Sequence, residues 1–179
     1  ELCHMLDSWQ ITHVDADLSP ETWEFLKKNR FFGMIIPKEY GGLGFSALAH
    51  RAVLQKVSSF CAVTASTIAV PNSLGPGELL LHYGTEEQKK LWLPQIASGE
   101  RMIAFCLSEK FAGSDAGGMR CQARLEGDEY VINGEKKWTT NGGVASIYTV
   151  FCVTDPRSKS RRISAIMVEE GPRPDRPAH

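Results

Sequence analysis

The stretch Met102-Ile-Ala-Phe-Cys-Leu-Ser-Glu-Lys-Phe-Ala-Gly-Ser-Asp115 passes from an apolar run into a loop of small residues. Its first half, Ile103–Leu107, has the length and apolar character of a buried strand. The loop that follows carries little side-chain bulk, so backbone N–H groups and the Ser114 hydroxyl are able to approach an anion or a planar ring. The stretch predicts a strand that delivers a binding loop, although a glycine-rich loop that binds nothing fits the spacing equally well.

The composition narrows the class of protein. The chain has 179 residues, a formal net charge of -1 and 42% hydrophobic residues, as expected of a soluble globular chain of one or two domains. Proteins that bind nucleic acids usually carry a basic excess, which is missing here. Five scattered cysteines without a Cys-x-x-Cys pair predict reduced, mostly core-filling thiols in an intracellular protein.

Several other classes of protein lack their sequence signals. No apolar run approaches the ~20 residues of a membrane-spanning helix, and the first residues show no signal-peptide pattern. No His-Glu-x-x-His motif or cysteine cluster suggests a metal, and Gly113–Gly117 is not the Gly-x-Ser-x-Gly turn of a hydrolase. The chain begins without Met and finishes in the proline-rich Gly171–His179, so we expect it to be part of a longer protein.

The residues before about 100 predict a helical bundle. A serine N-cap followed by proline predicts a helix over 19–29. Further helices are expected over 46–60, 62–69 and 77–83, the second of these apolar on nearly all sides. A last helix should begin at the capping box Thr85–Gln88, kink at Pro94 and finish at Gly99.

The segment Gly42-Leu-Gly-Phe-Ser-Ala47 imitates the glycine fingerprint of dinucleotide-binding Rossmann proteins. That fold expects an acidic residue about 20 positions further on to hold the ribose, and 45–77 contains none. A glycine-containing loop leading into the next helix is the better interpretation.

From Arg101 onward the pattern alternates as in strands. Strands are expected over 102–108, 119–125, 129–132, 135–140, 146–154 and 163–169. Asn133-Gly134 is a strong hairpin signal, and Glu126–Asp128 and Asn141–Gly143 predict adjoining turns. Because no helix intervenes, the pattern predicts an α+β chain in which an antiparallel, barrel-like β domain follows the helical bundle.

Three blocks of the sequence resemble the acyl-CoA dehydrogenase family. Phe105–Asp115 is similar to one signature of the family and Gly134-Glu-Lys-Lys-Trp-Thr-Thr-Asn-Gly-Gly143 to the other. The stretch Tyr83–Glu100 resembles the helix that leads into the first signature. The resemblance, which covers most of 31–168, implies an N-terminal helical domain at 1–100 and an incomplete central β domain at 101–179. The family's C-terminal four-helix domain has no counterpart here.

The resemblance also implies an FAD site in the β domain. The backbone of Phe105–Ser108 would run beside the pyrimidine half of the flavin, and the Ser108 hydroxyl would add a hydrogen bond. Gly113 and Ser114 would lie near the flavin pyrophosphate and the acyl-CoA entrance, with Ser114 also binding the pantetheine arm. The cofactor-binding residues implied in this way are Phe105, Leu107, Ser108, Gly113, Ser114, Trp138, Thr139 and Thr140.

The second signature would complete the site. Trp138 would cover one face of the flavin, and Thr140 would place its hydroxyl at N5, the atom that accepts hydride. Thr139 stands where many relatives have Ile, so its backbone should matter more than its side chain. Taken singly, Trp138 also fits a core aromatic, Thr140 a strand residue and Ser114 a loop cap. Only their joint spacing favours the flavin site.

The reaction implied is α,β-dehydrogenation of a fatty acyl-CoA thioester, as in fatty-acid β-oxidation. The family's proton acceptor is a glutamate of the C-terminal domain, so residues 1–179 alone should be inactive and hold no catalytic base. One departure stands out, because Glu109-Lys110 replaces the family's Glu-Pro and leaves the loop geometry open. Glu109 itself is expected to be structural.

The resemblance further implies an electron-transfer flavoprotein as electron acceptor, a homo-oligomeric whole protein, and a bacterial cytoplasmic or mitochondrial matrix location. Similarity of 31–46 and 70–84 to large bacterial fatty-acyl-CoA dehydrogenases favours medium or long acyl chains. Two alternatives stay open. One is an acyl-CoA oxidase or another flavin enzyme on the same scaffold, and the other is a non-catalytic flavin-binding or assembly relative.

Overall fold

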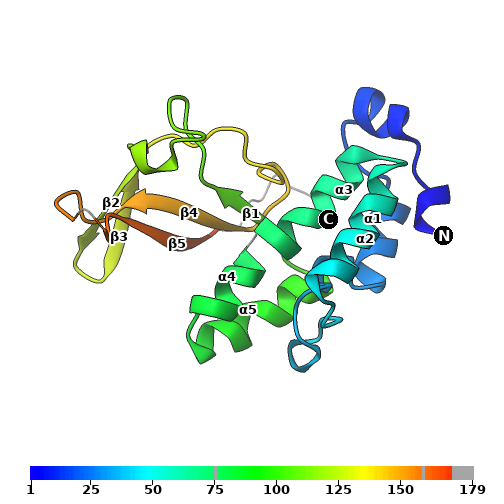
Figure 1. Ribbon diagram of the computed structural model, residues 1–179, viewed down its shortest axis with the longest axis horizontal. Coiled ribbons are helices and arrows are strands. Elements are labelled where there is room, and N and C mark those ends of the chain that lie inside the picture. Colours follow the sequence, from blue (N-terminus) through cyan, green and yellow to red (C-terminus); the bar gives the residue numbers. More distant parts are fainter. Residues whose placement is uncertain (75, 159, 171–179) are drawn as a thin grey trace.

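The structure is a computed structural model that describes residues 1–74, 76–158 and 160–170. Helices fill one side of the molecule and a five-stranded sheet the other, and α4 and α5 lie nearest the sheet (Figure 1). The predicted order, a helical half followed by a β half, is confirmed.

The α-helices of the described residues are α1 Pro20–Lys28, α2 Ala47–Ser58, α3 Ala62–Ala69, α4 Pro76–Tyr83 and α5 Glu86–Ser98. Short 3-10 turns occur at Leu2–His4, Phe31–Gly33, Lys38–Tyr40 and Ala116–Gly118, and π turns at Gln10–Val14 and Val70–Leu74. The helices predicted from the sequence are thus confirmed within a few residues at each end.

The helix ends form where the capping residues predict them. Ser19 Oγ accepts the Thr22 N–H at 3.2 Å and begins α1. Thr85 and Gln88 form the reciprocal capping box of α5, and Gly99 closes that helix with a φ of 73°. The helix continues through Pro94 to Ser98.

The sheet is built around its fourth strand. The strands are β1 Ile103–Cys106, β2 Gln122–Glu126, β3 Glu129–Asn133, β4 Ile147–Val153 and β5 Ile163–Glu169. β4 pairs in parallel with β1 along Ile103↔Ile147 to Cys106↔Val150, and in parallel with β2 at Gln122↔Val153. Its other edge pairs antiparallel with β5, while β2 and β3 form an antiparallel hairpin.

The expectation of a purely antiparallel sheet is therefore wrong, because the sheet is mixed. A parallel pair needs a long crossover, which is usually a helix. Here the 40 residues between β1 and β4 make that crossover with the β2–β3 hairpin and two loops. The absence of a helical pattern between the two strands thus gave a misleading signal about their direction.

Two local predictions in this crossover are also wrong. The hairpin turns at Gly127-Asp128, where Gly127 has a φ of 64°, and not at Asn133-Gly134. Gly134 instead serves close packing, because a Cβ built on it would lie 2.7 Å from the Cα of Cys121. Residues 135–140 form no strand, since Trp138 and Asn141 take positive φ values of 60° and 63° that a strand does not allow.

The hydrophobic core crosses from the helices to the sheet. One cluster of buried side chains fills the helical half around Leu26, Phe32 and Ile68. A second joins Leu93 and Ile96 of α5 with strand residues, including Ile103 and Ile147. This shared core gives the sheet a fixed position against α4 and α5.

Polar contacts reinforce the same boundary. Arg101 donates to Glu169 Oε2 at 2.8 Å and to the carbonyl oxygen of Ser146 at 3.0 Å. Trp92 of α5 donates its indole N–H to Glu169 Oε1 at 2.9 Å. The Arg101 and Trp92 hydrogen bonds hold the pKa of Glu169 below its ordinary value, although burial opposes them.

Other sequence predictions concern the glycine-containing loop before α2, the cysteines and membrane-spanning helices. Residues 42–46 form a loop that leads into α2, whose N-cap is Ser46 and whose first residue is Ala47. All five cysteines are free, and all except Cys3 are buried, as predicted for core-filling thiols. None of the helices in the described part of the chain combines the length and apolarity needed to cross a bilayer.

Candidate functional site

The two signature segments lie side by side at the carboxyl end of β1. Lys137 donates its backbone N–H to the carbonyl oxygen of Ser108 at 2.8 Å. Ser108 lies four residues before Ala112, where the small residues begin, and Lys137 directly precedes Trp138. A single backbone hydrogen bond thus joins segments that are 29 residues apart in the sequence.

An ion pair with little solvent exposure joins the same segments. Lys136 Nζ lies 2.8 Å from Glu109 Oε1, and the two side chains are only 10% and 9% exposed. Lys136 also donates to the carbonyl oxygen of Leu107 at 3.0 Å. Desolvated charges of this kind require partners, and each finds them in the other segment.

Glu109 extends this network to the start of β2. Its two carboxylate oxygens accept the backbone N–H groups of Arg120 at 2.7 Å and Cys121 at 2.9 Å. Burial alone would raise the pKa of Glu109, but the hydrogen bonds from Lys136 and from these amides hold it below its ordinary value. Glu109 is therefore a structural carboxylate, ionised near neutral pH and engaged by its own chain, as the sequence predicted.

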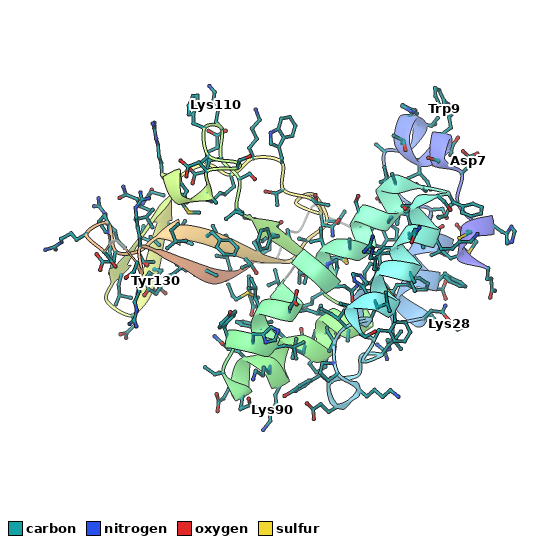
Figure 2. All side chains as sticks on the ribbon, in the orientation of Figure 1. Asp7, Trp9, Lys28, Lys90, Lys110 and Tyr130 are labelled. Carbon is teal, nitrogen blue, oxygen red and sulfur yellow. The ribbon has the colours of Figure 1, made fainter. Side chains whose placement is uncertain are left out.

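The loop after Glu109 turns tightly without the family's proline. Glu109 N–H donates to the carbonyl oxygen of Ala112 at 2.9 Å, and Ala112 N–H donates back at 3.4 Å. Lys110 takes no part in these two backbone hydrogen bonds, which is the position that a proline tolerates. The substitution therefore leaves the turn intact, with Lys110 and Phe111 at its exposed tip. Figure 2 shows Lys110 extending from this loop beyond the edge of the sheet.

Trp138 is the most unusual residue of the site. Its side chain is 82% exposed and its backbone has a φ of 60°. The ammonium group of Lys137 lies 4.7 Å from the centre of its ring. Exposure rules out the core-aromatic interpretation, and a bulky residue at positive φ is a strained arrangement of the kind found at functional sites.

The residues after Trp138 contact both halves of the molecule. The Thr139 side chain lies beside the thiol of Cys106 in β1, where it opposes the rise that burial causes in the pKa of Cys106. Asn141 donates from Nδ2 to the carbonyl oxygen of Thr67 in α3 at 3.3 Å. Thr140, between them, is exposed, and its hydroxyl has no hydrogen-bond partner among the described residues. Thr139 and Asn141 thus hold the segment in place, and the Thr140 hydroxyl between them is accessible.

The predicted site residues in β1 and directly after it have different surroundings. Phe105 is half-buried, and its ring centroid lies 4.8 Å from that of Phe151. Leu107 packs against the small cluster of Ala112, Met119 and Val153. The Leu107 carbonyl accepts a hydrogen bond from the Lys136 ammonium group, and the Ser108 carbonyl accepts one from the Lys137 N–H. Two of the backbone groups expected to bind the flavin therefore already have partners within the chain.

Gly113 and Ser114 lie on the open side of the loop. Both are exposed, and a Cβ built on Gly113 would meet nothing within 4 Å. Gly118, by contrast, is more crowded, because a Cβ there would lie 2.5 Å from Asp115 Oδ2 and that carboxylate would have to move. The protein's own packing therefore does not require Gly113, and the space beside it is free for a ligand.

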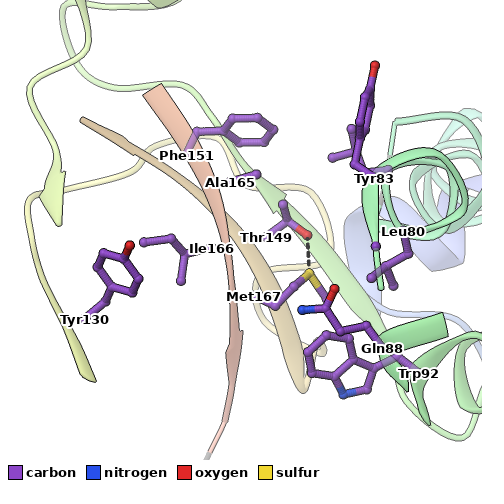
Figure 3. A pocket seen from close by; sticks show the side chains of 12 residues that line it. Leu80, Tyr83, Gln88, Trp92, Tyr130, Thr149, Phe151, Ala165, Ile166 and Met167 are labelled. Carbon is purple, nitrogen blue, oxygen red and sulfur yellow. Dashed lines mark hydrogen bonds between the residues drawn. The ribbon is translucent and has the colours of Figure 1, made fainter. Parts of the chain in front are cut away.

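A cavity of about 600 Å³ lies elsewhere, between helices α4 and α5 and the residues of β4 and β5 that face them. Figure 3 shows Leu80, Tyr83 and Trp92 on the helical side and Phe151, Ala165 and Met167 on the sheet side. None of the predicted site residues lines it. Within the described ranges, no group of three or more histidine, cysteine or acidic side chains is placed to hold a metal ion.

Sequence reasoning missed Lys136. Three charged residues in a row, Glu135-Lys136-Lys137, give no sign of which one is buried. Lys136 lies two residues before Trp138, whose positive φ is seen only in the structure. Glu109 could be singled out from the sequence, because it follows a buried strand.

Comparison with known proteins agrees with this arrangement. Residues 4–100 match the family model for the N-terminal domain of acyl-CoA dehydrogenases, and residues 104–175 match the model for the middle domain. The chain is 41% identical over 151 residues to a short-chain specific acyl-CoA dehydrogenase of Clostridium acetobutylicum, covering 83% of this chain and 40% of that protein. It is 42% identical over 135 residues to the human mitochondrial short-chain specific enzyme, covering 75% of this chain and 32% of that protein.

A solved structure shows the same fold. The butyryl-CoA dehydrogenase of Megasphaera elsdenii superposes with a TM-score of 0.75 at 32% identity, covering 86% of this chain and 41% of that one. The chain therefore spans less than half the length of these relatives. With both family models matched in order and the two signature segments joined in space, the chain belongs to the acyl-CoA dehydrogenase family.

Proposed function

We propose that this chain carries the FAD-binding wall of an enzyme that dehydrogenates acyl-CoA thioesters between the α and β carbons. FAD, when bound, supplies the acceptor for the β-hydride. The observation that supports the proposal most directly is the 2.8 Å hydrogen bond between Lys137 N–H and Ser108 O, because it joins both signature segments into one surface. Solved relatives that share the fold include an FAD-dependent dehydrogenase.

The exposed groups of this surface suit a planar cofactor with a diphosphate. Trp138 presents its ring to solvent and would cover one face of the isoalloxazine. The accessible Thr140 hydroxyl would hydrogen-bond flavin N5, and Ser108 the pyrimidine half, with Phe105, Leu107 and Thr139 supporting the same wall. The open loop at Gly113 and Ser114 would approach the diphosphate and the pantetheine arm.

The proton acceptor is proposed to come from outside residues 1–179. Glu109 is the carboxylate nearest the wall in sequence, but three N–H donors engage it and its pKa is lowered. A general base must be free to reach the proton it removes. The family's C-terminal helical domain would supply that carboxylate, so these residues alone should not catalyse the reaction.

The further assignments are part of the same proposal. We divide the chain at about residue 100, which the change of family model between 100 and 104 supports. The substrate would be a fatty acyl-CoA, the electron acceptor an electron-transfer flavoprotein, and the whole protein a homo-oligomer of the bacterial cytoplasm or mitochondrial matrix. The bacterial relative from Clostridium acetobutylicum and the human mitochondrial relative support this location.

The test is anaerobic reduction of the full-length, FAD-loaded protein by a series of acyl-CoAs from short to long chains. Bleaching of the visible flavin band with formation of enoyl-CoA would support the proposal. A flavin that no acyl-CoA reduces would contradict it and favour the non-catalytic alternative. Stoichiometric hydrogen peroxide in air, without need for an electron-transfer flavoprotein, would identify an oxidase instead.

A further inference from the structure

Lys136 occupies the junction of every segment that forms the proposed flavin wall. We propose that it is a positioning residue, whose ammonium group sets how the Ser108 segment and the Trp138–Thr140 segment align. This inference rests on the proposed function and adds to it a residue that determines the geometry of the wall. Lys136 itself faces the protein interior and does not touch the exposed side of that wall.

The contacts of the Lys136 ammonium group all lie between Leu107 and Met119, in the chain that links β1 to β2. Its Nζ donates to Leu107 O at 3.0 Å and to Glu109 Oε1 at 2.8 Å, and Met119 Sδ lies at 4.0 Å. An ammonium group has three donors, and in a side chain that is only 10% exposed they need partners within the protein. The end of β1 and the loop after it thus supply the site that holds this side chain.

Glu109 connects Lys136 to a third segment. Its carboxylate binds Lys136 on one side and the amides of Arg120 and Cys121, at the start of β2, on the other. The pair therefore ties together the chain after β1, the chain before β2 and the chain after β3. Burial of an ion pair contributes little net stability, but it favours one geometry over its alternatives.

The position of Lys136 in the chain makes it effective. In an extended segment, side chains two residues apart point the same way. Here the Lys136 side chain is 10% exposed, while Trp138, two residues further on, is 82% exposed and has a φ of 60°, outside the range of an extended segment. Fixing Lys136 immediately before the Lys137–Ser108 hydrogen bond therefore fixes where Trp138 turns outward.

Lys136→Met removes the ammonium group and keeps most of the side-chain volume. Lys90→Met is the matched control, because Lys90 is an exposed lysine of α5, distant from this loop (Figure 2). In the full-length protein, below the unfolding temperature of both variants, we expect Lys136→Met to weaken FAD binding at least about tenfold. The visible circular dichroism of bound flavin should change too, because ring orientation changes, whereas Lys90→Met should match the wild type in both.

Hydrogen exchange of the FAD-free full-length protein gives a readout that does not involve the cofactor. Peptides covering 107–121 and 135–141 should exchange faster in Lys136→Met, while those of α2 and α3 should not. Glu109→Gln is the second variant, and hydrogen exchange in the same peptides should be faster in it too. It tests the proposal if Lys136→Met fails to fold. A purely structural role would lower stability but leave FAD affinity and flavin dichroism unchanged in the folded protein.

The proposal is overturned if Lys136→Met binds FAD within about twofold of the wild type and both segments exchange at the wild-type rate. Failure of the proposed function looks different, because the wild-type protein itself would then take up no FAD. In that case the exchange comparison still decides whether Lys136 sets the alignment of the two segments.

Discussion

Asn141 donates its side-chain N–H to the carbonyl oxygen of Thr67 at 3.3 Å, and so connects the end of the Trp138 segment to helix α3. Asn141 has a φ of 63°, a left-handed conformation that asparagine tolerates better than most residues. One residue therefore turns the chain and joins the β half to the helical half.

Asn141→Ala should lose both contributions and destabilise the protein by about 1–3 kcal/mol, measured by urea unfolding. Asn141→Gly keeps the freedom to take positive φ and loses only the side-chain hydrogen bond, so it should cost less. Equal losses in the two variants would show that backbone conformation does not contribute at this position.

Gly134 tests the close packing of β3 against β2. Gly134→Ala would place a Cβ 2.7 Å from the Cα and Cβ of Cys121, at a φ of 152°. Because backbone atoms yield little, we expect a loss of roughly 1–3 kcal/mol in unfolding free energy. Gly127→Ala is the control, since its φ is also positive but nothing lies within 4 Å. A larger loss at Gly127 than at Gly134 would be inconsistent with this packing.

Cys152 gives a prediction about alkaline pH. The thiol is fully buried beside Cys121, whose sulfur lies 3.6 Å away, and burial raises the pKa of Cys152 to about 12. The unfolded thiol titrates near 9, so folding favours the protonated form. This contribution to stability is complete below about pH 9 and is lost as the pH rises toward 12.

Urea unfolding at several pH values between about 8 and 10.5 measures this loss. The wild type should lose stability over that range, at a slope of up to about 1.4 kcal/mol per pH unit above pH 9. Cys152→Ala should show a shallower decline, because the titrating group is gone. Parallel curves for the two proteins would contradict the assignment to Cys152.

Thr140 tests the chemistry of the wall separately from its shape. Thr140→Val keeps the shape of an exposed side chain and removes the hydroxyl, so full-length protein should retain FAD. Reduction of the flavin by acyl-CoA should slow by about tenfold or more if the hydroxyl serves N5. Stopped-flow absorbance measures the rate, and an unchanged rate would remove Thr140 from this role.

The fold could be predicted where signals are local. The caps Ser19, Thr85 and Gly99 act within one helical turn, so the sequence predicted the corresponding helix ends. The parallel pairing of β1 with β4 could not be predicted, because it depends on a crossover with no helix and on partners far apart in the chain. Residues 135–140 look like a strand only until the positive φ of Trp138 is known.

The residues of the candidate site could be proposed from the sequence only in part. The two signature segments carry the exposed residues Ser114, Trp138 and Thr140, and the resemblance pointed to them directly. The pairing of Lys136 with Glu109 could not be inferred, since the sequence offers two adjacent lysines and only the register of an irregular segment decides which one is buried.

Titration of the full-length apoprotein with FAD, for the wild type and Trp138→Ala, is the most direct test of the flavin wall. Trp138 is exposed, so its removal should change the unfolding free energy by no more than about 0.5 kcal/mol. We expect tight FAD binding by the wild type and binding at least about tenfold weaker by Trp138→Ala, because base or ring stacking on an aromatic side chain contributes on the order of 1–3 kcal/mol. Equal affinity in the two proteins, or no FAD uptake by the wild type, would contradict this expectation.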